Sequence, residues 1–336
     1  METYTILAST MTVVSFLVFI GIVLWAWSGR RKAAFDEAAC DIAPVVAADG
    51  RTVARRLVTL PALSAGAWRV KVEDEDAEGA LVVAPRACHL PAALRGGGRR
   101  FGPAALLYAL RRPGDQGIGD FTALAQAARA TAAAGGALVG VNPLHALFGH
   151  ERERASPYHP SDRRFLDPAY ADVAALPEFA AAPAARAAIA ALPDGPAIDY
   201  PAAWAAKVAA LDACFEAFSR LPSDDARAHA FHRFVAQGGE RLRRFAAFEA
   251  MAATRPGVPW QRWPEELRNP ADPAVARFAS RHAREVDFAL WMQWVADEQL
   301  GAAARDSGLE IGLYRDLAVG AAPAGAEAWD GQAALA

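Results

Sequence analysis

Polar side chains directly follow two short apolar runs that are typical of buried β-strands. Asn142 and His145 come after "ALVGV" at 137–141, and Asp316 comes after "LEIGLY" at 309–314. In parallel sheets, binding and catalytic residues gather at the carboxyl ends of the strands. An amide, an imidazole and a carboxylate could there bind a polar ligand, or the first two could brace a neighbouring loop. We therefore expect a site at this end of a sheet, with both roles open for Asn142 and His145.

A third segment brings further polar groups, in the stretch "ERASPYHPSDRRFLDP" at 153–168. It contains Ser156 and Tyr158 among prolines and charges, and it shows neither helical nor strand periodicity. Loops that only connect elements tend to be shorter than this one. We expect a loop that holds a ligand or another part of the fold, although a tyrosine in such a loop is more often an anchor than a ligand contact.

Composition and motif spacing argue against several other kinds of site. A net charge of −3 provides no basic surface for nucleic acid. The three cysteines are far apart, without a CxxC motif, and so predict neither a disulfide framework nor a zinc site. His229 and His232, and likewise His145 and His150, lack the HExxH context of a metal site. The glycines at 94–103 lack the pattern of a phosphate-binding loop, and we expect no metal and no cofactor.

The elements that would position the site follow a strand–helix–strand order. Residues 104–110, "AALLYAL", are predicted to form a buried strand, and 121–135 an amphipathic helix with Asp120 as its N-cap. The strand at 137–141 follows, and this order predicts a parallel sheet with a right-handed crossover. Asp120 is therefore expected to be a structural cap and not a ligand contact.

The long middle of the chain, 177–304, is predicted to be a helical subdomain. "WAAKVAALDACFEAFSRL" at 204–221 and "EVDFALWMQWVADEQL" at 285–300 repeat large apolar residues at helical spacing. We interpret these as core faces of helices, not as a stripe of ligand-binding aromatic residues.

The first forty residues differ in character from the rest. Residues 10–27 are apolar and uncharged, long enough for a membrane span, and Arg30, Arg31 and Lys32 follow at once. This charge asymmetry predicts a single-pass inner-membrane protein with the C-terminal part in the cytoplasm. Residues 1–40 resemble the small single-span subunit of cbb3-type cytochrome oxidases, which implies respiratory oxidase subunits as partners.

Between this anchor and the α/β part we expect a small β-rich module at 51–93, flanked by linkers at 41–50 and 94–103. "WRVKV" at 68–72 and "ALVVAP" at 80–85, with an acidic turn between them, predict a hairpin within that module.

From residue 45 onward the chain resembles the N-terminal half of the amylomaltases, which are 4-alpha-glucanotransferases of the (β/α)8 class. The resemblance rests on four stretches: "LYALRRPGDQGIGDF", "VGVNPLHALF", "RASPYHPSDRRFLDPAYADV" and "IGLYRDLAVGAAPAGAEAW". It implies an α-1,4-glucan or maltooligosaccharide as the substrate, and a transfer reaction that needs neither metal nor cofactor. It further implies that Ser156, Tyr158 and Asp316 contact the sugar.

The resemblance also implies that residues 104–336 form only part of a (β/α)8 barrel, about three of its eight strands with a large helical insertion. In that family the nucleophile and the acid/base lie further along the chain, so no catalytic residue can be assigned in this sequence. We expect a 4-alpha-glucanotransferase family protein that ends before its catalytic carboxylates. Two alternatives remain: an accessory membrane subunit of an oxidase with an inert extension, and a non-catalytic glucan-binding module.

Overall fold

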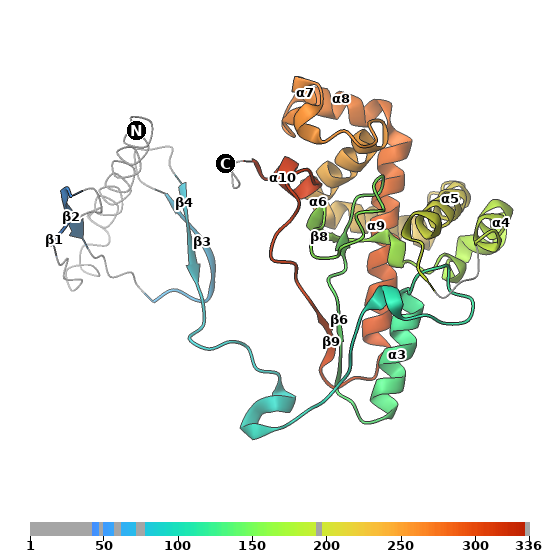
Figure 1. The fold of residues 1–336 in the computed structure, drawn as a ribbon. Helices are drawn as coiled ribbons and strands as arrows, with labels where there is room; N and C mark the ends of the chain where they lie inside the picture. The colour runs from blue at the N-terminus through green and yellow to red at the C-terminus, as the bar shows by residue number, and fades with distance from the viewer. Residues whose placement is uncertain (1–41, 47–49, 57–61, 72–77, 193–196, 333–336) are drawn as a thin grey trace. The chain divides into compact units, whose positions relative to one another are not determined.

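The computed structural model describes residues 42–46, 50–56, 62–71, 78–192 and 197–332 of the chain (Figure 1). The chain divides into two compact units, Met1–Leu90 and Pro91–Ala336. Unit 2 contains the mixed α/β part in which the polar residues discussed above lie.

The described residues of unit 1 form two separate antiparallel hairpins. β1 (Ile42–Val46) pairs with β2 (Thr52–Arg56), and β3 (Gly66–Lys71) pairs with β4 (Glu78–Val83). The β3–β4 pair confirms the hairpin predicted from the alternating residues around the acidic turn.

Both expected linkers contain regular structure and are corrected accordingly. The segment 41–50 includes all of β1, because its apolar residues pair with β2 and Gly50, at a φ of 80°, allows the chain to reverse. The segment 94–103 includes most of a 3₁₀ helix, η1 (Ala92–Gly97), which is kinked at Arg95 and Gly96.

The centre of unit 2 is a three-stranded parallel sheet in the order β5–β6–β9. β6 (Leu138–Val141) lies between β5 (Ala104–Ala105) and β9 (Gly312–Arg315), with Val139 opposite Leu313. This confirms the parallel sheet and the strands expected around 137–141 and 309–314.

The strand expected at 104–110 is much shorter than predicted. After β5 the chain turns into a 3₁₀ helix, η2 (Leu107–Ala109), in which Leu110 N–H bonds to Leu107 C=O at 3.0 Å. The reason is a long-range contact: the backbone N–H of Leu107 donates to the Asn142 side chain at 2.6 Å instead of to a neighbouring strand.

One face of the sheet is covered by α3 (Phe121–Ala133) and α9 (Ala283–Arg305), which lie side by side in Figure 1. Asp120 caps α3 as expected, with its carboxylate accepting from Ala123 N–H at 2.8 Å. The buried residues of this layer come from the helices and from β6, and include Leu107, Phe121, Leu124, Val139, Val141 and Leu300.

The stretch 153–168 was predicted to be a loop, but part of it is a β-strand. Its last part forms β8 (Asp162–Leu166), which pairs antiparallel with β7 (His145–Ala146) through an irregular register. The residues "DRRFL" show no alternating apolar pattern, because the two arginines form ion pairs with the distant residues Glu327 and Asp330 and the buried Asp162 pairs with Arg164.

The middle of unit 2 is helical, as expected. Its α-helices are α4 (Pro183–Ala190), α5 (Tyr200–Phe218), α6 (Ala226–Ala253), α7 (Glu265–Arg268) and α8 (Pro273–Arg281), followed by α9, and α10 (Ala326–Asp330) comes after β9. Three short 3₁₀ helices lie between β8 and α4, namely η3 (Pro168–Tyr170), η4 (Val173–Ala175) and η5 (Pro177–Ala181), and η6 (Trp260–Arg262) lies between α6 and α7. Aromatic residues of α5 and α9 pack in the core, with Trp291 and Trp294 buried, which confirms their interpretation as core faces.

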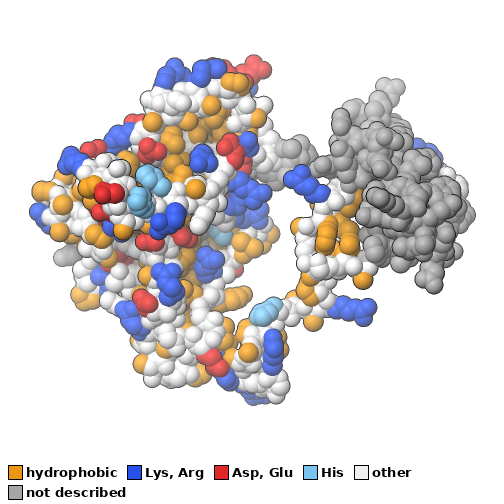
Figure 2. Space-filling model, turned by 180° about the vertical axis from the view of Figure 1, so that it is seen from behind, with side chains coloured by type: hydrophobic (Ala, Val, Ile, Leu, Met, Phe, Trp, Pro, Cys, Tyr) orange, Lys and Arg blue, Asp and Glu red, His pale blue; other side chains and the backbone are white. Residues whose placement is uncertain are grey.

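The predicted inner-membrane localisation is corrected. Within the described ranges, no helix is both long enough and apolar enough to cross a bilayer. The longest helices, α6 and α9, carry charged residues such as Arg243 and Asp297 between their apolar positions, and basic and acidic side chains are interspersed on the face of unit 2 seen in Figure 2. The expected span at 10–27 and the oxidase resemblance of 1–40 lie outside the described residues.

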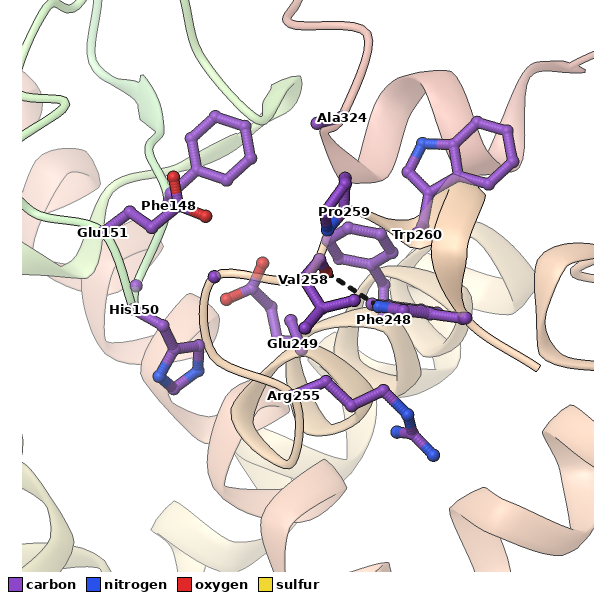
Figure 3. A pocket seen from close by; sticks show the side chains of 14 residues that line it. Phe148, His150, Glu151, Phe248, Glu249, Arg255, Val258, Pro259, Trp260 and Ala324 are labelled. Atoms are coloured by element: carbon purple, nitrogen blue, oxygen red, sulfur yellow. Dashed lines mark hydrogen bonds between the residues drawn. The ribbon is translucent and has the colours of Figure 1, made fainter.

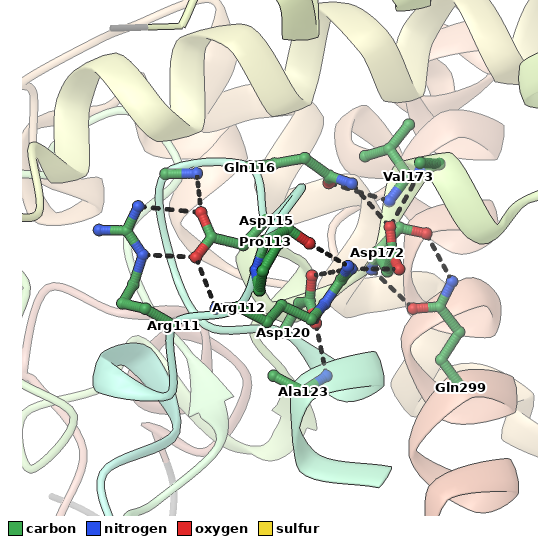
Figure 4. Close-up of polar contacts among 12 residues, drawn as sticks. Arg111, Arg112, Pro113, Asp115, Gln116, Asp120, Ala123, Asp172, Val173 and Gln299 are labelled. Atoms are coloured by element: carbon green, nitrogen blue, oxygen red, sulfur yellow. Dashed lines mark hydrogen bonds and ion pairs between the residues drawn. The ribbon is translucent and has the colours of Figure 1, made fainter. Parts of the chain in front are cut away.

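A buried ion-pair network joins the loop before α3 to the helical part of unit 2 (Figure 4). The Nη2 atom of Arg112 donates to Asp120 at 2.7 Å and to Asp172 at 2.6 Å. Asp172 also accepts from the Gln116 amide at 2.6 Å, and its backbone N–H donates to Gln299 of α9 at 2.7 Å. Since both aspartates are almost fully buried, Arg112 neutralises two carboxylates that water cannot reach.

We predict that Arg112→Met lowers the free energy of unfolding by about 3 kcal/mol or more, because it leaves two buried carboxylates without a cation. Urea denaturation of the full chain would measure this change. The control is Arg220→Met, which removes an exposed pair with Glu216 at 3.6 Å and should cost no more than about 1 kcal/mol. Equal effects of the two substitutions would contradict the role given to Arg112.

Candidate functional site

An open cleft of about 370 Å³ lies at the carboxyl ends of the parallel strands. Backbone and side chains from all three strands and from the 153–168 segment form its wall: Ala104, Ala105, Leu106, Gly140, Val141, Asn142, Tyr158, Tyr314 and Asp316. Three of the five residues predicted for a site therefore meet in one cleft, namely Asn142, Tyr158 and Asp316.

Tyr158 and Asp316 both line this cleft. The pKa of Tyr158 is raised, mainly because the nearby Asp316 carboxylate attracts the hydroxyl proton and disfavours the charged phenolate. The Tyr158 side chain is 56% exposed, so the ring keeps a free face toward solvent. The pair thus presents an aromatic surface and a carboxylate beside each other.

The position of Asp316 is fixed by its own backbone. Its N–H extends the β6–β9 ladder by donating to Val141 C=O at 3.0 Å, and its Oδ1 accepts from Leu317 N–H at 2.8 Å. Asp316 lines the cleft, and Oδ1 is the one carboxylate oxygen with a backbone partner. A short strand and one turn are therefore enough to hold this carboxylate.

Asn142 lies in the cleft wall, but its side chain is fully used within the protein. Its Oδ1 accepts from Leu107 N–H at 2.6 Å, and its Nδ2 donates to Pro143 C=O at 2.8 Å and to the Tyr170 hydroxyl at 3.3 Å. The residue is only 4% exposed. Of the two roles left open by the sequence, these contacts favour bracing of η2 and β6.

His145 and Ser156 are not among the residues that line the cleft. The Nε2 atom of His145 accepts from Ala318 N–H at 3.2 Å, so the ring braces the segment that carries Asp316. Burial lowers the pKa of His145, and the charge of Arg163 lowers it further, which favours the neutral ring that can accept this bond. Ser156 is exposed in the turn before Tyr158, where its carbonyl accepts from His159 N–H at 3.3 Å.

Ion pairs between β8 and α10 stabilise the wall of the cleft. Arg163 binds Glu327 of α10 and donates to Val319 C=O at 2.9 Å. Arg164 pairs with Asp330 at 2.7 Å. These contacts clamp the 153–168 segment, with Tyr158, onto the segment that carries Asp316.

The sequence reading missed Tyr314, which lines the cleft and is 66% exposed. Its signal was present: Tyr314 lies two residues before Asp316, and residues two apart on a strand point to the same face.

A second pocket, shown in Figure 3, lies between α6 and the turn after β7. It contains Glu249, whose pKa burial raises to about 8 although the charge of Arg152 lowers it. The volume of this pocket, about 30 Å³, is that of one water molecule and far less than a sugar ring needs. It is therefore not a second candidate for the ligand site.

No group of three or more His, Cys, Asp or Glu side chains in the described part of the chain is arranged to hold a metal ion. The chemistry available in the cleft is hydrogen bonding and aromatic contact, with one carboxylate, Asp316.

Together, the fold and the cleft define an α/β protein with a candidate site at the carboxyl ends of parallel strands. A family model described as 4-alpha-glucanotransferase matches residues 105–336, and the chain belongs to this family.

Individual relatives agree with this assignment. The chain is 40% identical over 309 residues to a 4-alpha-glucanotransferase of Mycobacterium tuberculosis (strain ATCC 25618 / H37Rv), a match that covers 86% of this chain and 42% of the relative. It is 29% identical over 297 residues to a 4-alpha-glucanotransferase of Haemophilus influenzae, covering 81% of this chain and 42% of that protein. The chain thus spans less than half of the length of these relatives.

Solved structures show the same fold. The amylomaltase from Corynebacterium glutamicum superposes with a TM-score of 0.63 at 26% identity, covering 88% of this chain and 44% of that one. An amylomaltase from Streptococcus agalactiae in complex with acarbose gives a TM-score of 0.59 at 16% identity, covering 70% and 46%, which supports the fold alone. The family assignment favours the glucanotransferase interpretation over the oxidase subunit.

We predict that Asn142→Ala lowers the free energy of unfolding by about 1–3 kcal/mol, because it leaves the buried Leu107 N–H without an acceptor. Chemical denaturation would measure the loss. Asp316→Asn, at a less buried position of the same cleft, should change stability by no more than about 0.5 kcal/mol. An Asn142→Ala variant with an unchanged free energy of unfolding would show that the amide does not brace the fold.

Proposed function

We propose that this chain binds α-1,4-linked maltooligosaccharides in the cleft, as the part of a 4-alpha-glucanotransferase that holds the glucan during transfer of α-1,4-glucan segments. The single observation that carries the proposal is the cleft itself, in which Tyr158, Tyr314 and Asp316 meet at the carboxyl end of the sheet. Family membership adds the class of ligand.

The chemistry of the cleft suits a sugar. The apolar faces of a glucose ring pack on aromatic rings, and Tyr158 and Tyr314 are both more than half exposed. The Asp316 carboxylate can accept hydrogen bonds from sugar hydroxyls, and the Tyr158 hydroxyl can donate one to the ligand or accept one from it. Ser156, exposed two residues before Tyr158, is the further contact that we propose at the rim.

The sheet that positions these residues fits the first part of a (β/α)8 barrel. Three parallel strands in sequential order, with α3 and α9 on one face and the cleft on the other, are compatible with the start of such a barrel. On this proposal, residues 104–336 form about three of eight strands, and the helices between 177 and 304 form an insertion before β9.

Binding of a glucan in the cleft is not sufficient for glycosyl transfer. Retaining glycosyl transfer uses two carboxyl groups about 5 Å apart, one as nucleophile and one as acid/base. Asp316 is the one carboxylate among the residues that line the cleft. This favours the second candidate, a glucan-binding part without its own activity, for the 336-residue chain taken by itself.

We predict that the full chain binds maltotriose and that Tyr158→Ala weakens binding about tenfold, since loss of an aromatic contact costs about 1.4 kcal/mol. Isothermal titration calorimetry would measure the affinities. Phe101→Ala, at an aromatic position 64% exposed but absent from the cleft wall, is the matched control and should bind as the unmodified chain does. Equal affinity of the Tyr158 variant would refute the proposed site.

We further predict that the chain alone releases no glucose from maltotriose. An acid/base residue contributes about 100- to 10,000-fold to such reactions, and one carboxylate cannot fill both roles. The assay follows glucose and longer oligosaccharides by chromatography after prolonged incubation. Product that disappears in Asp316→Asn would mean that the cleft holds a working carboxylate pair.

A further inference from the structure

The turn after β7 contains an arginine that is buried but only partly hydrogen-bonded. Arg152 is 7% exposed, and its Nη1 atom donates to Asp167 at 2.7 Å. Its guanidinium group stacks on Trp204, 4.0 Å from the centroid of the ring. Its Nε atom is buried and has no hydrogen-bond partner in the described part of the chain. Because a buried donor without an acceptor is unfavourable, this atom indicates a ligand that brings an acceptor.

Arg152 lines a small cavity between the turn after β7 and the helices α5, α6 and α9. The volume of this cavity is about 20 Å³, and Trp204 of α5, Glu249 of α6 and Gln293 of α9 contribute to its wall. A water molecule needs about 10–15 Å³ of such space, so the cavity has room for one. Arg152 also lines a second cavity, but that one measures about 10 Å³, at the lower limit for a water, and Glu249 does not reach it.

Two polar groups in the wall of the 20 Å³ cavity are free to bind a ligand. The Gln293 amide is not one of them, since it accepts from Leu166 N–H at 3.0 Å and donates to Leu166 C=O at 2.8 Å. The Trp204 indole N–H donates to a backbone carbonyl of the turn at 2.7 Å. The Glu249 carboxyl group forms no hydrogen bond or ion pair with the described residues. It remains, with the Nε atom of Arg152, as a partner for a ligand.

The charges around the cavity do not balance a negative charge on Glu249. Arg152 favours such a charge, but its guanidinium is already paired with Asp167. Asp167 and Asp162 both disfavour it. The described residues that α5 and α9 place in the wall are uncharged. One cation therefore faces two carboxyl groups, and a proton on Glu249 restores the balance.

The groups on the other side of Glu249 do not supply a cation either. His150, Glu151 and Arg255 line the neighbouring pocket (Figure 3). Burial lowers the pKa of His150, which favours the neutral imidazole. Arg255 donates to the Thr254 hydroxyl at 2.6 Å, and in Figure 3 its guanidinium points away from Glu249.

We propose that the cavity between Arg152 and Glu249 is an internal water site. One water accepts the hydrogen bond of Arg152 Nε and binds the Glu249 carboxyl group, which keeps its proton because no free cation lies beside it. The water and the proton join the turn that precedes Tyr158 to α6. The site thus stabilises the start of the segment that carries Tyr158, and the proposal does not rest on glucan binding in the cleft.

A high-resolution crystal structure of the full chain tests the water site. It should show an ordered water within about 2.7–3.2 Å of Arg152 Nε and of one Glu249 carboxyl oxygen. The water should remain in Glu249→Gln, since this variant keeps both polar partners. An Arg152 Nε atom bonded to a protein group, or a cavity without an ordered water, would overturn the proposal.

The dependence of stability on pH tests the proton. Burial raises the pKa of Glu249 from 4.5 to about 8, so the carboxyl group ionises at lower pH in the unfolded chain than in the folded one. Stability should therefore fall as the pH rises from about 4.5 to about 8. Between pH 5 and pH 8, urea denaturation should show the unfolding equilibrium constant rising at least about tenfold more in the unmodified chain than in Glu249→Gln. Glu298→Gln, at an exposed position of α9, is the matched control and should follow the unmodified chain.

The proposal requires both results. A pH dependence that Glu249→Gln removes, without an ordered water, would overturn the water site, because burial alone would then keep the carboxyl group neutral. An ordered water with the same pH dependence in the unmodified chain and in Glu249→Gln would overturn the protonated state of Glu249. Maltotriose affinity, measured separately, continues to test the cleft alone.

Discussion

The parts of unit 2 are joined through one largely buried cation, the guanidinium of Arg112, held between the buried carboxylates of Asp120 and Asp172. Asp120 caps α3, and Asp172 caps η4 while its backbone is bonded to Gln299 of α9. A single side chain therefore links the helix after β5 to the helix before β9. Removing two carboxylates from water is unfavourable unless each finds a cation, and Arg112 meets that requirement for both.

A second buried charge lies where the helical part of unit 2 packs near the Arg112 network. Lys207 of α5 is fully buried close to these aspartates and donates to Ala169 C=O at 2.7 Å. Burial lowers the pKa of Lys207 to about 8, although Asp120 and Asp172 oppose this shift. The packing of α5 against η3 thus buries a second cation near the Arg112 network, and the relative positions of sheet and helices are set by charge as well as by apolar packing.

Long-range contacts hold together the segments that form the cleft. Most of the polar side chains in these segments bind other parts of the protein and are not free to bind a ligand. Asn142 and His145, which the sequence offered as possible ligands, serve to hold η2 and the segment after Asp316. Arg163 and Glu327 fix the 153–168 segment against the end of the sheet. The groups left facing the cleft are Tyr158, Tyr314 and Asp316, a set suited to holding a sugar and lacking the second carboxylate that transfer requires.

The sequence by itself determined the elements whose signals are local. The Asp120 cap lies three residues before the N–H that it binds, the β3–β4 hairpin alternates around its turn, and α5 and α9 repeat apolar residues at helical spacing. Each of these features depends on residues within one or two turns or strands of each other. The resemblance based on four sequence motifs also indicated the family, and it implied that Tyr158 and Asp316 contact the same ligand.

Only the tertiary structure decided the features that depend on contacts between distant segments. β5 is short because Asn142, 35 residues away, takes the N–H of Leu107, and β8 forms where Arg163 meets Glu327, 164 residues away. The length of β5 and the presence of β8 therefore depend on contacts between residues that are far apart in the sequence. Local sequence patterns do not predict such contacts, because the residues come within hydrogen-bonding distance only when the chain folds.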